Sequence, residues 1–210
     1  ELSPNPTAVI NLYTAFKAKG KNEWAFQTIT KGRSMLKDAY PLNFQFAEYY
    51  GANKETKKMV QEYLNLIDFN SGYTETVQML LSRVIDFNNK SSEEYTTLKT
   101  ELLTRAQKNP SDVQAAEMVT WLFIQSRDFP TALVQEQALD KRLQLNGSRV
   151  YDLGIICVEN NDYPTARKAF TYVKNLGQEN PMFYQAENAM LNTRFKEITT
   201  VRNVTADEIQ

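Results

Sequence analysis

The chain has 210 residues, with 24 Lys plus Arg and 25 Asp plus Glu, so its formal net charge is −1. This length is enough for one sizeable domain, or two small ones, with a buried core. The near-neutral charge argues against a protein held to nucleic acid by phosphate neutralisation, and the hydrophobic fraction of 42% argues against a disordered chain. No run of about 18 apolar residues occurs, so no insertion into a membrane is predicted.

The residue types that are missing or rare exclude several kinds of catalytic site. The chain has no histidine, which excludes Ser-His-Asp and Cys-His nucleophile systems, zinc sites with histidine ligands and imidazole bases. Its single cysteine, Cys157, can form neither a disulfide within the chain nor a multi-cysteine metal cluster. Because the usual histidine activator of a thiolate is absent, we interpret Cys157 as a buried structural residue. No metal and no cofactor is predicted.

Apolar residues four positions apart predict a series of paired helices that are separated by short turns. In chain order, the residues expected to break the helices are Gly20, Gly51-Ala52-Asn53, Ser91-Ser92, Arg127-Asp128 and Asn160-Asn161. Polar residues at or beside three of the predicted turns are expected to start helices, and these are Thr7, Asn53 and Thr165. A last helix is expected over about residues 181–196, after Asn180-Pro181.

The sequence repeats itself at a fixed spacing. Arg127-Asp128-Phe129-Pro130-Thr131-Ala132 recurs 34 residues later as Asn161-Asp162-Tyr163-Pro164-Thr165-Ala166, and the same shift backwards reaches Glu94-Tyr95. A fixed period of this length is typical of helical repeat proteins. The extended frame predicts an insertion of five residues near Asn70-Ser71-Gly72. The predicted repeats cover about residues 6–39, 40–78, 79–112, 113–146 and 147–180.

This pattern resembles the tetratricopeptide repeat, a helix-turn-helix unit of 34 residues. The fifth repeat fits best, and its matching residues are Leu153-Gly154, Tyr163, Ala166, Phe170 and Gly177. The fourth repeat departs from the family pattern at Glu136, where an aromatic or aliphatic residue is usual. The resemblance covers about residues 6–180. It implies an all-α, right-handed α-solenoid of about five helix-turn-helix repeats plus a C-terminal covering helix, in one domain over 1–210.

The resemblance also implies a function and a site. In this family the first helix of each repeat lines a concave groove. Carried over position by position, the predicted groove residues are Arg83, Phe87, Glu117, Trp121, Tyr151 and Ile155. Tryptophan and tyrosine are residue types that anchor interfaces, so the resemblance implies a non-catalytic scaffold that binds a peptide or protein partner. The alternative that these aromatic residues pack on a neighbouring helix stays open.

Two other functions also stay open. One is a structural spacer in a larger envelope protein, and the other is a hydrolase or glycan-binding domain that uses carboxylates in the groove. The runs Trp121-Leu-Phe-Ile-Gln and Arg149-Val-Tyr-Asp-Leu are similar to the large repeat proteins of Bacteroidetes-type bacteria, which implies export to the periplasm or cell envelope. The start at Glu1 and a capping pattern at Thr205-Ala206-Asp207-Glu208 lead us to expect a piece of a longer chain.

Overall fold

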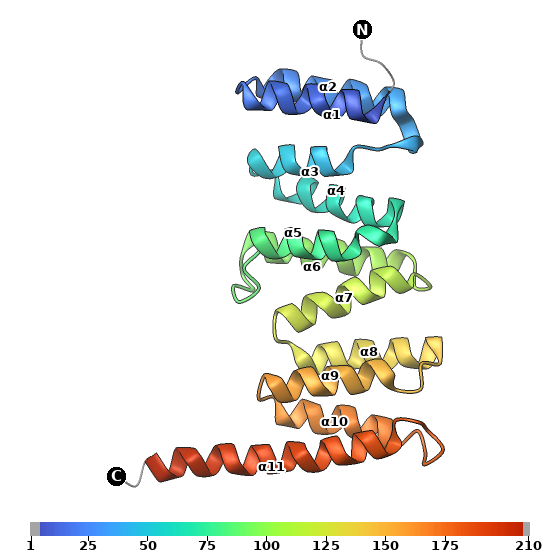
Figure 1. Cartoon of the computed structure of the whole chain (residues 1–210), viewed down its shortest axis with the longest axis vertical. Coiled ribbons are helices and arrows are strands. Elements are labelled where there is room, and N and C mark those ends of the chain that lie inside the picture. The colour runs from blue at the N-terminus through green and yellow to red at the C-terminus, as the bar shows by residue number, and fades with distance from the viewer. Residues whose placement is uncertain (1–4, 208–210) are drawn as a thin grey trace. The chain divides into compact units, whose positions relative to one another are not determined.

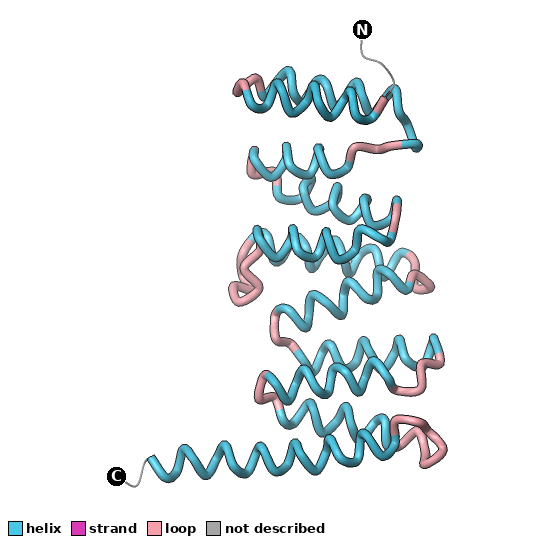
Figure 2. Tube along the Cα trace, in the orientation of Figure 1, coloured by secondary structure: helices cyan, strands magenta, loops and turns pink. Residues whose placement is uncertain are grey.

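The computed structural model describes residues 5–207, and every regular element in that range is a helix (Figure 1, Figure 2). This confirms the prediction of an all-α fold. The α-helices are α1 Pro6–Ala18, α2 Asn22–Leu36, α3 Asn43–Ala52, α4 Thr56–Phe69, α5 Thr74–Val84, α6 Glu93–Lys108, α7 Val113–Gln125, α8 Phe129–Leu143, α9 Ser148–Glu159, α10 Tyr163–Lys174 and α11 Phe183–Asp207. Two 3₁₀-helices cover Lys37–Ala39 and Ser71–Tyr73.

The chain divides into two compact units, one up to Glu101 and one from Leu102 onwards. In the first unit α1 packs against α2 and α3 against α4, while in the second α7 packs against α8, α9 against α10, and α10 against α11. Fully buried residues such as Val9 in the first unit and Phe170 in the second lie where these helices meet. Burying one such side chain contributes roughly 1.5–3 kcal/mol.

The acidic residue of the repeated motif caps the helix that follows it. The side chain of Asp128 accepts a hydrogen bond from the backbone N–H of Thr131 at 3.4 Å, and Asp162 does the same for Thr165 at 3.1 Å. A proline in the first turn of both helices fixes a helical backbone angle where no N–H is needed. The capping residue of α10 is therefore Asp162 and not Thr165, whose N–H is the group that is capped.

The two other predicted helix starts are also shifted. Asn5 caps α1 in place of Thr7, because the Asn5 side chain accepts the backbone N–H of Thr7 at 2.8 Å. Asn53 ends α3 instead of starting the next helix, and α4 begins at Thr56. The sequence shows which residues break the helices but not on which side of the turn each one acts.

The third helix pair lies five residues away from its predicted register. The sequence predicts a pair over 79–112, but its first helix, α5, covers Thr74–Val84. The extra residues lie in the turn over 85–92, and not near Asn70-Ser71-Gly72. Phe87 lies in that turn and is buried, so its apolar side chain imitates a core position of a helix that has already ended.

The last helix is longer than predicted. α11 continues to Asp207, past the predicted end near 196, and the backbone of Thr205 lies within it. The helix start predicted at Thr205 is therefore wrong, and Glu208 of that pattern lies outside the described residues. Among the helices of residues 5–207, none is both long and apolar enough to cross a membrane.

Gly154 lets the chain of α9 come close to α10. A Cβ atom at this position would lie 2.5 Å from Cε1 of Phe170, whose ring is fully buried. Any side chain at position 154 would therefore force the Phe170 ring or the backbone to move. This contact accounts for the small residue that the sequence places here.

Candidate functional site

The second unit contains a pocket of about 550 Å³ beside α9, α10 and α11. Its lining residues are Tyr151, Ile155, Val158, Glu159, Phe170, Gln185, Asn188, Ala189, Asn192, Thr193, Phe195 and Lys196. Two of the predicted groove residues, Tyr151 and Ile155, are among them. The pocket is therefore our candidate binding site.

One wall of the pocket is apolar and belongs to α9. Tyr151, Ile155 and Val158 are four and three positions apart, a spacing that places all three on one face of the helix. The Tyr151 ring lies 5.4 Å from the ring of Phe170, centre to centre, at an angle of 55°. Because Phe170 is fully buried, this contact holds Tyr151 against the protein core.

The opposite wall belongs to α11 and carries side-chain amides. Gln185, Asn188 and Asn192 are three and four positions apart, are exposed, and make no side-chain hydrogen bond within residues 5–207. Phe195 continues the same wall and is 68% exposed. Sequence reasoning missed these residues because it treated the last helix as a cover, although their helical spacing is visible in the sequence.

The remaining predicted groove residues lie elsewhere. Glu117 and Trp121 are half-buried on α7, and neither lines this pocket. Arg83 is exposed near the end of α5, in the first unit. Phe87 packs edge-on against Tyr95, with ring centres 6.5 Å apart, and is 8% exposed. The prediction that Phe87 lines an open groove is therefore wrong, because it is a core residue of the turn after α5.

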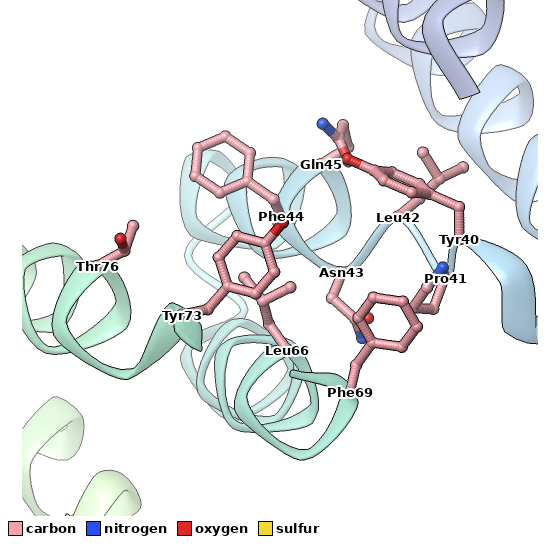
Figure 3. Close-up of a pocket in the computed structure, with 10 residues that line it drawn as sticks. All are labelled: Tyr40, Pro41, Leu42, Asn43, Phe44, Gln45, Leu66, Phe69, Tyr73 and Thr76. Carbon is pink, nitrogen blue, oxygen red and sulfur yellow. The ribbon is translucent and has the colours of Figure 1, made fainter. Parts of the chain in front are cut away.

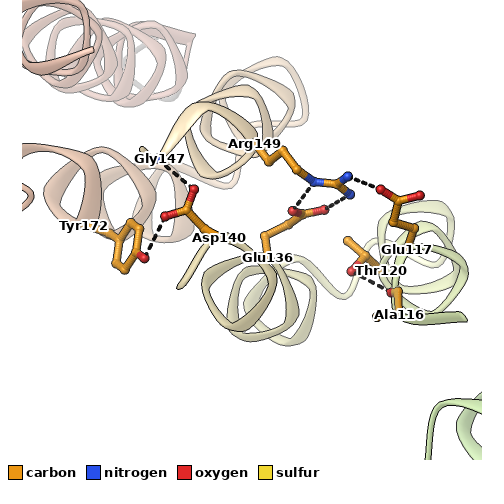
Figure 4. Close-up of polar contacts among 8 residues, drawn as sticks. All are labelled: Ala116, Glu117, Thr120, Glu136, Asp140, Gly147, Arg149 and Tyr172. Atoms are coloured by element: carbon orange, nitrogen blue, oxygen red, sulfur yellow. Dashed lines mark hydrogen bonds and ion pairs between the residues drawn. The ribbon is translucent and has the colours of Figure 1, made fainter. Parts of the chain in front are cut away.

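A polar network links α7, α8 and α9 in the second unit (Figure 4). The guanidinium of Arg149 donates two hydrogen bonds to the Glu136 carboxylate, at 2.8 and 3.0 Å, and a third to Glu117. These carboxylates raise the pKa of Arg149, chiefly through the bonds to Glu136. Glu136 is 4% exposed, so Arg149 balances a carboxylate that is almost completely removed from water.

A second buried carboxylate fixes the loop between α8 and α9. Asp140 is 3% exposed, and it accepts hydrogen bonds from the backbone N–H of Gly147 at 2.7 Å and from the hydroxyl of Tyr172 at 2.9 Å (Figure 4). Burial and the bond to Asp140 raise the pKa of Tyr172 to about 12. Asp140 therefore joins α8, α10 and the start of α9, which carries the apolar wall of the pocket.

Cys157 is fully buried on α9, as the sequence predicts. Burial, with a smaller contribution from the Asp162 carboxylate, raises its pKa to about 12. The thiol is therefore protonated in the folded protein near neutral pH, and thiolate chemistry is suppressed.

We expect the Cys157 thiol to react with a disulfide reagent only after the protein unfolds. At about pH 8 the folded protein should stay unmodified over a time in which the urea-unfolded chain reacts completely. Because folding raises this pKa from 9.0 to about 12, the protonated thiol contributes stability below pH 9.0, and that contribution is lost as the pH rises towards 12. Equal rates of modification with and without urea would contradict the buried position.

Comparison with known proteins gives no relative. No protein-family model matches the chain, and no curated protein or solved structure shows a significant match to it.

Proposed function

We propose that the chain is a non-catalytic interaction scaffold of the tetratricopeptide type, and that it binds a peptide segment of a protein partner in the pocket beside α9 and α11. The family part of this proposal rests on the residue pattern of the sequence. It is supported by the paired helices, by the aspartate caps that recur 34 residues apart, and by the close contact at Gly154. The right-handed solenoid of about five repeats belongs to the same proposal.

The observation that carries the binding function is the chemical contrast between the two walls of the pocket. Tyr151 and Ile155 offer apolar surface for side chains of a ligand, while the amides of Asn188 and Asn192 each offer a donor and an acceptor. A peptide in an extended conformation has the same two kinds of group, because its side chains alternate with free backbone N–H and C=O groups. The two walls together therefore fit a peptide better than a purely apolar ligand.

The charges around the pocket limit the kind of peptide. Glu159 and Lys196 both line it, one of each sign, and neither has an ion-pair partner within residues 5–207. Neither a strongly acidic nor a strongly basic segment is favoured by this pair, because one of the two charges would be left opposite a like charge. We therefore propose a segment with apolar side chains and little net charge.

A selection from random peptides displayed on phage tests this proposal. The full chain serves as the target, and a selected peptide is synthesised and titrated against the wild type and an Asn188→Ala/Asn192→Ala variant. Loss of two hydrogen-bonding side chains should weaken binding by about tenfold or more. Circular dichroism verifies that both proteins are folded.

Asn175→Ala is the matched control, because Asn175 is exposed at the end of α10 and does not line the pocket. It should leave the affinity for the selected peptide unchanged. If no peptide is selected, or if both variants bind it as the wild type does, the pocket is not a peptide site. The spacer function would then be the better description of the chain.

A further inference from the structure

A second pocket, of about 250 Å³, lies in the first unit at the start of α3 (Figure 3). Its walls come from three segments, namely the start of α3 with the residues before it, the end of α4, and the 3₁₀ turn that leads into α5. Most of the lining is aromatic or aliphatic. The residues that the argument uses are Tyr40, Asn43, Phe44, Gln45, Phe69 and Tyr73.

Aromatic side chains from separate segments meet at this pocket. Phe44, Phe69 and Tyr73 belong to α3, to α4 and to the 3₁₀ turn, and they are 40%, 44% and 37% exposed. Asn70 fixes that turn, because its side chain accepts the backbone N–H of Gly72 at 2.9 Å. The three rings thus present apolar surface to one shared space, which favours a ligand with an apolar ring.

The base of the pocket contains hydrogen-bond acceptors without donors. Asn43 and Gln45 are 5% and 8% exposed, and the side-chain oxygens of both are buried without a hydrogen-bond partner. The orientation of the Asn43 amide is set by its nitrogen, which donates to the Glu62 carboxylate at 2.8 Å. Turning the amide over would place its oxygen against that carboxylate, so the unpaired atom is the oxygen. A buried acceptor without a donor is unfavourable, and a ligand N–H or O–H would relieve it.

No charged side chain lines this pocket. The nearest carboxylate described above, that of Glu62, is already bound by both terminal nitrogens of Arg33, at 2.8 and 2.7 Å. An ionic ligand would therefore lose its hydration without meeting a free opposite charge, so the lining favours a neutral ligand.

We propose that this pocket binds a neutral aromatic ring that carries an N–H donor, and that the N–H bonds to the side-chain oxygen of Asn43 or Gln45. The pocket volume suits about one bicyclic ring system. Such a ring occurs in free N-heterocycles and in the tryptophan side chain of a peptide, and the two sources share this chemistry.

Calorimetric titration of the full chain with indole tests the proposal, and benzofuran is the matched ligand because it has the same shape with an oxygen in place of the N–H. Indole should bind saturably, and benzofuran about tenfold more weakly, because its oxygen cannot satisfy an acceptor. Titration with N-acetyltryptophanamide separates the sources. If it binds as well as indole, a peptide supplies the ring, and if only indole binds, the ligand is a small molecule.

Variants locate the site. Phe69→Ala and Gln45→Met should each weaken indole binding several-fold, while Trp24→Ala should not, although Trp24 is also an exposed aromatic residue of the first unit. Gln45→Met keeps the side-chain length and the backbone C=O that accepts the hydroxyl of Tyr13. Thermal melts of each variant exclude loss of folding as the cause. The proposal is overturned if indole does not saturate, if benzofuran binds equally well, or if Trp24→Ala has the same effect as the pocket variants.

Discussion

Replacing Arg149 with alanine is expected to lower the free energy of unfolding by about 3 kcal/mol. The reason is the position of Glu136, whose side chain is 5% exposed and is held by two hydrogen bonds from the Arg149 guanidinium. Without the arginine, a buried carboxylate has lost its opposite charge and two donors. Urea denaturation, followed by circular dichroism at neutral pH, measures the change.

Removing both members of this pair should cost much less than removing one. In the variant Glu136→Leu/Arg149→Met, an apolar side chain occupies the buried position and no charge is left unpaired. We expect its free energy of unfolding to lie within about 1 kcal/mol of the wild-type value. A double variant as unstable as Arg149→Ala would show that the arginine acts through packing and not through the charge of Glu136.

Arg167→Ala is the matched control for the arginine substitution. Arg167 pairs with Glu197, and both side chains are about one-third exposed, so their interaction is screened by water. The expected loss is below about 1 kcal/mol. A loss as large as that of Arg149→Ala would mean that burial of the carboxylate does not set the cost.

Glu136 also shows how far the sequence alone leads. Its departure from the apolar pattern is visible in the sequence, but its partner lies 13 residues away, in the next helix. The repeat pattern aligns equivalent positions of different helix pairs, and it does not show contacts between unlike positions. The sequence therefore identified an unusual residue without indicating that a buried ion pair explains it.

The helices themselves were predictable where capping residues and apolar spacing agree. Asp128 and Asp162 recur at the repeat spacing, and the structure begins α8 and α10 directly after them. The third pair was misplaced because Phe87 is buried in a turn, and burial alone does not distinguish a turn from a helix. Of the site, Tyr151 and Ile155 lie on the proposed binding pocket, as their helical spacing suggested.

The amides of the site and the aromatic pocket could not be predicted in the same way. Asn188 and Asn192 read as an ordinary polar helix face until α11 is placed against α9. Phe44 and Phe69 lie 25 positions apart and on different helices, so no periodicity connects them. Such sites depend on which helix faces meet, and that depends on packing that a single sequence does not state.

Substituting Ala166 with glutamate should lower the free energy of unfolding by well over 2 kcal/mol, and it tests the packing of α9 with α10. Ala166 is fully buried near the start of α10, and its two neighbours on the same face, Ala169 and Phe170, are fully buried as well. A glutamate there introduces both extra volume and an unpaired charge into a space that holds one methyl group.

Ala138→Glu is the matched control for this substitution. Ala138 lies on α8 and is exposed, so the same change there adds a solvated carboxylate on the surface of a helix. We expect its effect to stay within about 0.5 kcal/mol of zero, because exposed surface substitutions rarely matter more. Thermal and urea denaturation of both variants would give the comparison. If Ala166→Glu melted within a few degrees of the wild type, Ala166 could not lie between packed helices, and the assignment of the second repeated motif to the α9–α10 interface would have to be abandoned.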